Sequence, residues 1–225
     1  MSIKLIAFDL DGTLVDSAPD IVRAVDVTLK ELGLPAPGGD RVMEWVGDGV
    51  TRLLKRALTG EKDGEPDPRK LEQVLTVFRR AYGAALHVHS ELYPGTLETL
   101  ELLHGHLRLV CITNKSAQFT EPLLASLGIR GYFDMVVSGD TLAVLKPDPR
   151  PLLHAAEAFA VPPKHCCMVG DSRNDILAAK AAGFHAVAVS HGYHQGADLK
   201  GLGAEALLDS LVELPGWLAS ARTPG

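Results

Sequence analysis

Two carboxylates stand close together near the start of the chain. Asp9 and Asp11 follow the apolar run Leu5 to Phe8, which is typical of a strand buried on both faces of a parallel sheet. Side chains two positions apart on an extended chain point the same way, so both acids are expected to face one spot. Adjacent carboxylates repel each other unless one is protonated or a cation lies between them. Oxygen ligands alone favour a hard ion such as Mg²⁺.

Gly12 and Thr13 continue this stretch. Glycine lets the backbone approach a ligand closely, and the amides that follow it can face an anion. The alternative is an ordinary strand that ends in a polar turn, where Asp and Gly are common. The functional interpretation therefore depends on whether further reactive residues follow the later strands.

Alternating apolar patterns predict the elements that position these acids. From Pro94 onward, strand-like and helical segments alternate, which indicates an α/β fold with a doubly wound parallel sheet. The expected strands are 107–113, 135–138, 166–170, 185–189 and 206–208, and the expected helices are 96–103, 117–127, 151–159, 174–182 and 211–218. Residues 220–225 are expected to fray.

The segment from Ala18 to Val88 contains no strand-like run. Apolar spacing predicts helices over 21–32, 42–58 with an interruption at 47–49, and 71–82. Such a block is too long for one crossover of a parallel sheet. It therefore predicts an all-helical cap, residues 18–93, inserted after the first strand of a core formed by 1–17 and 94–225. Pro and Gly in the linkers suit a hinge.

Polar residues stand at the ends of the expected core strands. Ligands of such sheets bind beyond the carboxyl ends of the strands, where the strand order reverses. Thr113 and Asn114 end one strand, Lys146 follows the next, and Asp171 and Asp175 follow the one after. Each has a purely structural alternative, as a helix cap, a solvated lysine or a helix N-terminal acid. Their occurrence at successive strand ends favours a common site.

The stretch from Asp9 to Ser17 resembles the first motif of the haloacid dehalogenase superfamily, whose phosphatases use an aspartate nucleophile. Thr113, Lys146 and the 170–175 stretch match its later motifs in order. The strings at 8–18, 56–58, 170–176, 178–183 and 191–193 look like those of bacterial phosphoglycolate phosphatases. The resemblance covers nearly the whole chain, although the 145–149 loop looks shorter than in some members.

This resemblance implies a role for each motif residue. Asp9 would be the nucleophile and form an aspartyl phosphate. Asp11 would protonate the leaving group and then deprotonate water. Mg²⁺ would be held by Asp9, the backbone carbonyl of Asp11 and Asp171. Further residues would bind the phosphoryl group or support the metal. These are Gly12, Thr113, Asn114 and Lys146 for the phosphoryl group, and Asp175 for the metal or for Lys146.

Substrate specificity is expected to lie in the cap. The Gly47-Asp48-Gly49 turn offers free amides and backbone freedom. Arg56 is the favoured cation for a carboxylate of the substrate, against the alternative that it is an ordinary solvated helix charge.

Composition limits the classes of partner. The 225 residues carry a net charge of −6, with 46% hydrophobic and 22% charged residues, which is ordinary for a globular protein. This balance argues against nucleic-acid binding, and no apolar run reaches the length of a membrane span. Cys111, Cys166 and Cys167 lie in apolar runs and indicate buried reduced thiols, so we expect a cytoplasmic protein. We expect a monomer or homodimer.

Several functions remain open on these grounds. The main one is a Mg²⁺-dependent phosphatase that acts on a small phosphomonoester, with 2-phosphoglycolate as the expected substrate. A β-phosphoglucomutase-like enzyme or a haloacid dehalogenase would use the same aspartate differently, although a dehalogenase has no need of Asp11. A phospho-accepting binding module, such as a response-regulator receiver, would carry no inserted cap.

Overall fold

A parallel sheet forms the centre of the molecule. The computed structural model describes residues 2–194 and 196–220. The sheet has six strands in the order β5-β4-β1-β6-β7-β8, and all neighbouring pairs are parallel. The strands are β1 (Leu5–Phe8), β4 (Arg108–Ile112), β5 (Met135–Val137), β6 (Cys166–Gly170), β7 (His185–Val189) and β8 (Ala206–Leu208). This arrangement confirms the predicted doubly wound α/β fold.

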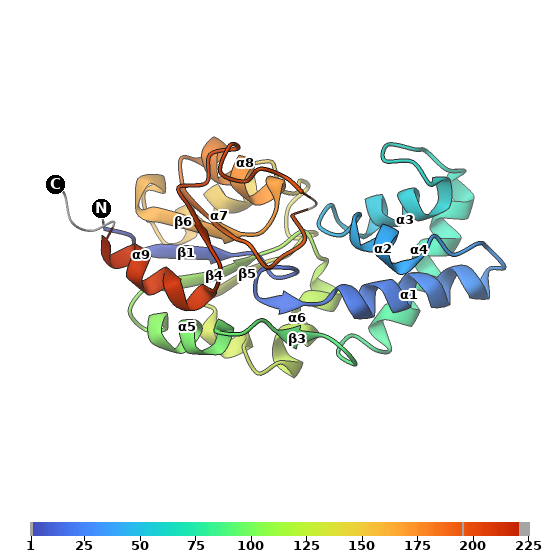
Figure 1. The fold of residues 1–225 in the computed structure, drawn as a ribbon, viewed down its shortest axis with the longest axis horizontal. Helices are drawn as coiled ribbons and strands as arrows, with labels where there is room; N and C mark the ends of the chain where they lie inside the picture. Colours follow the sequence, from blue (N-terminus) through green and yellow to red (C-terminus); the bar gives the residue numbers. More distant parts are fainter. Residues whose placement is uncertain (1, 195, 221–225) are drawn as a thin grey trace.

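Helices cover both faces of this sheet (Figure 1). The side chains of α5 (Thr96–Leu103), α6 (Ala117–Ser126) and α9 (Leu214–Ser220) pack on one face. Those of α7 (Arg150–Ala158) and α8 (Arg173–Ala182) pack on the other. All four residues of β1 are fully buried, as expected for a strand covered on both faces.

The order of the strands places the site. Strand β1 lies between β4 and β6, so the connections after β1 and before β6 leave the sheet on opposite sides. The crevice at the carboxyl ends of these three strands is therefore the switch point, where ligands bind in doubly wound folds.

Four helices form a separate group beside the sheet, which we call the helical lobe (Figure 1). They are α1 (Ala18–Glu31), α2 (Gly39–Met43), α3 (Val50–Thr59) and α4 (Pro68–Gly83). The lobe has its own apolar cluster, to which α6 of the sheet domain contributes Phe119. None of the described helices combines the length and apolar character needed to cross a membrane.

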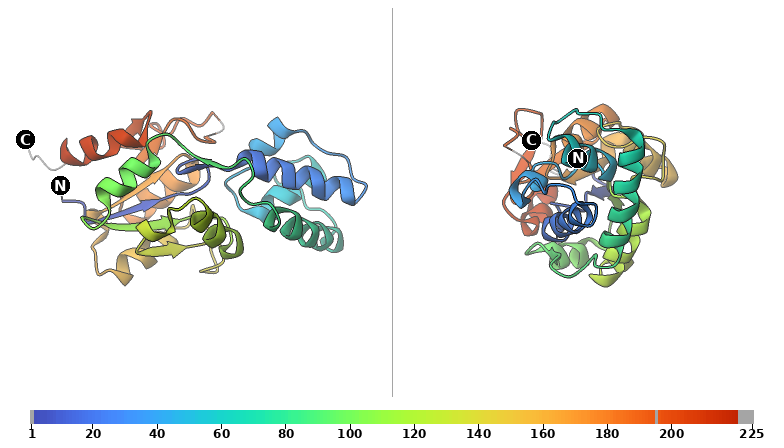
Figure 2. Two further views of the ribbon diagram at one scale, coloured as in Figure 1. Left: turned by 90° about the horizontal axis from the view of Figure 1, so that it is seen from below. Right: turned by 90° about the vertical axis from the view of Figure 1, so that its right-hand side faces the viewer.

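The chain enters and leaves the helical lobe through a small ribbon that the sequence patterns did not predict. Strand β2 (Val15–Asp16) pairs with β3 (Glu91–Leu92) in antiparallel register. The two connecting chains therefore run side by side (Figure 2). Strands of two residues are too short to show an alternating pattern, which explains why they were missed.

Most of the expected helices and strands occur within two residues of their predicted ends. Two predicted helices are divided. The 42–58 segment forms α2 and α3, with a turn around Gly47–Gly49, and the 211–218 segment begins as a 3₁₀ turn, Leu211–Glu213, before α9. The expectation of fraying at 220–225 concerns mainly residues 221–225, which lie outside the described part of the chain.

A buried carboxylate joins the start of the helical lobe to its end. Asp20, in the first turn of α1, is fully buried. Its Oδ2 accepts hydrogen bonds from the amides of Val88, His89 and Ser90 at 3.0, 2.9 and 2.9 Å, and from the Ser90 hydroxyl at 2.8 Å. Burial opposes ionisation of Asp20, but these donors outweigh it and lower the pKa of the carboxyl.

We expect Asp20→Asn to lower the free energy of unfolding by roughly 1–3 kcal/mol at neutral pH, because buried amides would lose a charged acceptor. A lowered pKa stabilises the folded state above the usual carboxyl range, and this contribution is lost on acidification. The difference between variant and wild type in urea unfolding should therefore shrink as the pH falls below about 4. Asp63→Asn, at an exposed loop position, is the control. An equal urea midpoint for both variants would contradict the stabilising role of the Asp20 hydrogen bonds.

Candidate active site

Three carboxylates meet at the switch point. Asp9 follows β1, Asp171 follows β6 and Asp175 lies in the first turn of α8. Each offers an oxygen that lies within 4.8 Å of the others, and all three residues are buried. The sequence prediction that Asp9 and Asp171 converge is confirmed. Within the described chain this is the cluster whose geometry could hold a metal ion.

Lys146 provides a positive charge to this cluster. Its Nζ lies 2.9 Å from Asp9 Oδ1 and 2.6 Å from Asp175 Oδ1, and donates to the Ile112 carbonyl at 2.6 Å. Burial disfavours the ammonium, but Asp175 and Asp9 outweigh that effect and hold the pKa of Lys146 above its usual value. Lys146 is only 3% exposed, so it is no solvated loop lysine.

The carboxylates still carry more negative charge than Lys146 neutralises. Burial, opposed by Lys146 and reinforced by Asp175, raises the pKa of Asp9 to about 7. Burial and the neighbouring Asp175 and Asp9 also raise the pKa of Asp171 well above its usual range. Raised carboxyl pKa values mean that the charged form lacks compensation. A divalent cation among these oxygens would supply it.

Tight packing holds Asp171 in position. Its Oδ1 accepts from the Thr13 hydroxyl at 2.8 Å, and its Oδ2 accepts from the Tyr193 amide at 2.6 Å. Gly12 adopts a φ of +88°, and a Cβ there would lie 2.3 Å from Asp171 Oδ2. A Cβ at Gly192 would lie 2.3 Å from Asp171 Cβ. Both glycines are therefore required for close approach to this carboxylate.

We expect Gly12→Ala to weaken the binding of a divalent cation to the acidic cluster roughly 10- to 100-fold, because the new methyl group must displace Asp171. Mg²⁺ titration followed by calorimetry measures this loss. Gly33→Ala is the matched control: Gly33 also has a positive φ, +65°, but open space where the Cβ would lie. Equal Mg²⁺ affinity in the two variants would contradict the role of Gly12 in the position of Asp171.

Asp175 has both of its carboxylate oxygens engaged. Besides the contact with Lys146, its Oδ2 accepts from the Ser172 amide at 3.0 Å and from the Ser172 hydroxyl at 2.6 Å. Asp175 thus caps the N-terminus of α8 and also contacts Lys146. Its geometry fits both a structural role as a helix cap and a supporting role in the site. A Cβ at Gly170 would lie 2.3 Å from Asp175 Cγ, so this strand end is closely packed too.

Asp11 lies outside the acidic cluster and has its own cation. Lys115 Nζ donates to its Oδ1 at 2.9 Å and its Oδ2 at 3.1 Å, and the Ser17 hydroxyl donates a short hydrogen bond to Oδ1. The Asp11 carboxylate is thereby directed toward the helical lobe rather than toward Asp171. This separation suits a group that exchanges protons with a leaving group.

Thr113 and Asn114 follow β4 at the same edge of the sheet. The Thr113 hydroxyl accepts from the Lys115 amide at 3.2 Å. The Asn114 side chain links three segments, because its Nδ2 donates to the carbonyls of Gly47 and Lys146 at 3.0 Å and its Oδ1 accepts from the Lys146 amide at 2.9 Å. Because these contacts occupy the Asn114 side chain, only its backbone amide could bind a phosphoryl group.

The Gly47-Asp48-Gly49 turn contacts the sheet domain. Besides the Gly47 contact, Asp48 Oδ1 accepts from Asn174 Nδ2 at 2.7 Å. Arg56 does not join the site. Its Nη2 lies 2.6 Å from Asp48 Oδ2, its Nε donates to the Lys62 carbonyl at 2.9 Å, and the residue is 3% exposed. Arg56 thus braces the turn, which its helical spacing alone did not indicate.

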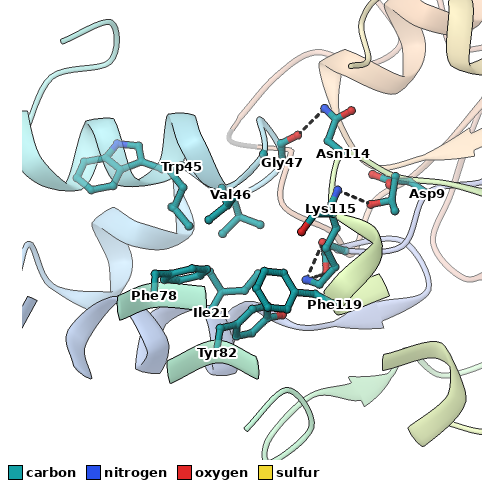
Figure 3. Close-up of a pocket in the computed structure, with 16 residues that line it drawn as sticks. Asp9, Ile21, Trp45, Val46, Gly47, Phe78, Tyr82, Asn114, Lys115 and Phe119 are labelled. Carbon is teal, nitrogen blue, oxygen red and sulfur yellow. Dashed lines mark hydrogen bonds and ion pairs between the residues drawn. The ribbon is translucent and has the colours of Figure 1, made fainter. Parts of the chain in front are cut away.

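A cavity lies between the acids and the helical lobe (Figure 3). Its volume is about 50 Å³. Asp9, Asp11, Thr113 and Lys115 form its polar side. The opposite wall is apolar and comes mainly from the lobe: Ile21, Trp45, Val46, Val50, Leu53, Phe78, Tyr82 and Phe119.

The sequence analysis gave no role to two residues of the site. Lys115 directly follows the Thr113–Asn114 pair, and Tyr193 closes the 191–193 string. The Tyr193 hydroxyl donates to Asp16 Oδ1 at 2.6 Å and accepts from the Ala18 amide at 2.9 Å, beside the entry to the helical lobe. Lys115 could have been found from its position directly after the Thr113–Asn114 motif. The spacing of Tyr193 did not indicate a contact with Asp171.

Comparisons agree with this architecture. The family model of haloacid dehalogenase-like hydrolases matches residues 3–183. The chain therefore belongs to the haloacid dehalogenase-like hydrolases, and the predictions of family and of an enzyme are confirmed.

Two named relatives and one solved structure show a more specific similarity than the family model. The chain is 45% identical over 219 residues to the phosphoglycolate phosphatase of Nitrosococcus oceani, covering 97% of each chain. It is 45% identical over 214 residues to that of Nitrosospira multiformis, covering 95% of this chain and 94% of the relative. The crystal structure of a predicted phosphoglycolate phosphatase from Haemophilus somnus 129pt matches with a TM-score of 0.89 and 32% identity, covering 96% of this chain and 98% of the other.

Proposed function

We propose that the protein is a Mg²⁺-dependent phosphomonoester hydrolase that converts 2-phosphoglycolate to glycolate and phosphate. The observation that carries the class is the cluster of Asp9, Asp171 and Asp175 at the switch point, with Lys146 bound to Asp9 and Asp175. The phosphoglycolate phosphatases among the relatives at 45% identity support the substrate.

The donor set suits Mg²⁺. All available ligand atoms are carboxylate oxygens, the choice of a hard divalent ion. We propose Asp9, Asp171 and the Asp11 carbonyl as the protein ligands, with Asp175 as a support because its oxygens already bind Lys146 and Ser172. Bound Mg²⁺ would offset repulsion between Asp9 and the phosphoryl dianion and stabilise the charge of the transition state.

Asp9 is the proposed nucleophile. One of its oxygens attacks phosphorus, the bond from phosphorus to the leaving oxygen breaks, and an aspartyl phosphate forms. Protonated Asp11 gives its proton to the leaving alkoxide and becomes a carboxylate. It then takes a proton from water as that water attacks phosphorus, and the bond from phosphorus to Asp9 breaks. The i, i+2 spacing of these acids places Asp11 near the phosphorus without contacting it.

The remaining residues bind the phosphoryl oxygens. Lys146 contacts Asp9 at 2.9 Å, so its ammonium reaches a group bonded to that carboxylate. Thr113 lines the same cavity, and the Asn114 amide faces this edge of the sheet in our proposal. The amides of Thr13 and Leu14, after Gly12, instead donate to the Leu10 carbonyl, so Gly12 serves the close approach to Asp171 rather than the phosphoryl group. These donors would stabilise charge that develops on the phosphoryl group.

We propose that residues 18–93 are the cap and that 1–17 with 94–225 are the catalytic core. In this proposal the leaving group occupies the cavity between the acids and the apolar wall of the helical lobe. The Gly47–Gly49 turn shapes its rim through contacts with Asn114 and Asn174. Arg56 acts on specificity only through Asp48 in this proposal.

The proposed setting is the cytoplasm, supported by three free buried cysteines. The partner is a small phosphomonoester; nucleic acid is not an expected ligand of this acidic chain. A monomer or homodimer stays a prediction.

We expect hydrolysis of 2-phosphoglycolate with Mg²⁺ and loss of turnover in excess chelator. A panel containing 2-phosphoglycolate, a sugar phosphate and a nucleoside monophosphate, assayed for released phosphate, measures both. A higher kcat/KM for sugar phosphate would reject the substrate but retain the class. Isomerised sugar phosphate without phosphate release would instead identify a mutase.

A further inference from the structure

The cavity has one cation in its described lining, and it is Lys115. This residue follows β4 and is 8% exposed. Its ammonium lies 4.8 Å from the centroid of the Tyr82 ring, which belongs to the apolar wall of the cavity. Burial disfavours the charge of Lys115, but Asp11 outweighs it and holds the pKa of the ammonium above its usual value.

Lys115 retains capacity to bind a second anion. An ammonium has three N–H donors, and the described hydrogen bonds of Nζ are those to the two oxygens of Asp11. A carboxylate beside Lys115 would therefore find a charged donor that has already been removed from solvent. Charge-assisted hydrogen bonds in such surroundings are stronger than neutral ones.

Tyr82 supplies an independent sign of a ligand. It is 2% exposed and lines the cavity, and its hydroxyl lies beside the Lys115 ammonium, yet no described residue accepts the hydroxyl proton. Buried hydroxyls without partners are rare because the loss of hydration is uncompensated. The Tyr82 hydroxyl and the Lys115 ammonium lie at the same end of the cavity (Figure 3). Burial raises the pKa of this phenol, so it remains a neutral donor.

We infer that Lys115 and the Tyr82 hydroxyl form a carboxylate subsite that selects phosphomonoesters with an acid group one carbon from the ester oxygen. This inference rests on the proposed phosphatase function and assigns its substrate class. Neither residue was given a substrate role by the sequence.

The position of Asp11 relates this subsite to the reaction. The leaving oxygen must contact Asp11 to receive its proton. In 2-phosphoglycolate a single carbon separates that oxygen from the carboxylate group. A cation that recognises the carboxylate must therefore lie beside Asp11, where Lys115 Nζ contacts Oδ1 at 2.9 Å.

Other cations of the helical lobe are less suited to this role. Arg56 is bound to Asp48 and to the Lys62 carbonyl. Arg52 and Arg79 are exposed and line a separate outer cleft rather than the cavity. Exposed charges bind anions weakly because water screens them.

The test compares two substrates of equal chain length, 2-phosphoglycolate and ethyl phosphate, which lacks the carboxylate. Lys115→Met should lower kcat/KM for 2-phosphoglycolate roughly 10- to 100-fold more than for ethyl phosphate. Much of the difference should appear as a higher KM, because the contact exists before the transition state as well as in it. Tyr82→Phe should show the same selective loss, several-fold in size.

Controls separate this inference from its alternatives. Arg79→Gln, at an exposed position, should leave the ratio of the two kcat/KM values unchanged. Equal losses for both substrates in Lys115→Met would overturn the subsite and assign Lys115 to the orientation of Asp11 alone. Tyr82→Phe removes an unpartnered hydroxyl, so it tests the subsite even if Lys115→Met fails to fold; an unchanged ratio there also counts against the subsite. A wild-type enzyme that hydrolyses no phosphomonoester rejects the proposed function itself.

Discussion

Asp9→Asn should reduce turnover of 2-phosphoglycolate by a factor of at least about 10⁴, because an amide oxygen is a poor nucleophile and cannot form the aspartyl phosphate. The fold should persist, since Asp9 lies at the tip of β1 beyond the last residue of the strand. Released phosphate measures turnover, and circular dichroism with thermal unfolding measures the fold. Acid quenching followed by mass spectrometry should detect phosphate on Asp9 in the wild type and none in the variant.

Asp63→Asn is the control for this change, because it removes a carboxylate from an exposed loop position. Its turnover should equal that of the wild type. Phosphate release by Asp9→Asn within tenfold of the wild type would reject Asp9 as nucleophile and point to direct attack by water.

Lys146→Met should have the second-largest effect. It removes a cation that lies 2.9 Å from Asp9 and 2.6 Å from Asp175, and so leaves buried carboxylates without their protein counter-ion. Breaking a buried pair in this way is expected to lower the free energy of unfolding by about 3–5 kcal/mol. Turnover should fall roughly 10³-fold, because the positive charge that would bind the phosphoryl oxygens is lost.

Mg²⁺ separates the two consequences of Lys146→Met. A divalent cation should restore part of the lost stability, since it supplies positive charge to the same carboxylates, but it should not restore turnover. Thermal unfolding with and without Mg²⁺ tests this, with Lys164→Met, at an exposed position, as control. If Mg²⁺ gives the variant no greater stabilisation than the wild type, the carboxylates do not share a metal site.

The sequence predicted the acidic part of the site because strand ends are determined by local pattern. The buried run before Asp9 and the run before Asp171 fix where both strands end, and a parallel sheet brings such ends to one edge. Asp9 and Asp171 could therefore be paired across the chain without knowledge of side-chain positions. The end of a strand did not predict the position of Lys146 in this way, because a loop separates Lys146 from β5.

Sequence reasoning was weakest for the helical lobe. Arg56 has the spacing and charge of a substrate contact, but the packing of α3 directs it to Asp48. Helical periodicity shows which face is buried but not which buried charge faces a cavity. The roles of Lys115 and Tyr193 depend on contacts with residues far away along the chain. Lys115 contacts Asp11, 104 positions away, and Tyr193 contacts Ala18, 175 positions away. No local pattern encodes such distances.

The ribbon of β2 and β3 has a consequence for how this family can diversify. Because Val15 and Leu92 are paired neighbours, the segment between them starts and finishes at almost the same point in space. A segment attached in this way can be lengthened, shortened or exchanged without displacing the strands that hold the acids. Chimeras that carry a relative's 18–93 segment should thus retain the nucleophile and Lys115, and should change only the part of the substrate range that the apolar wall of the cavity determines.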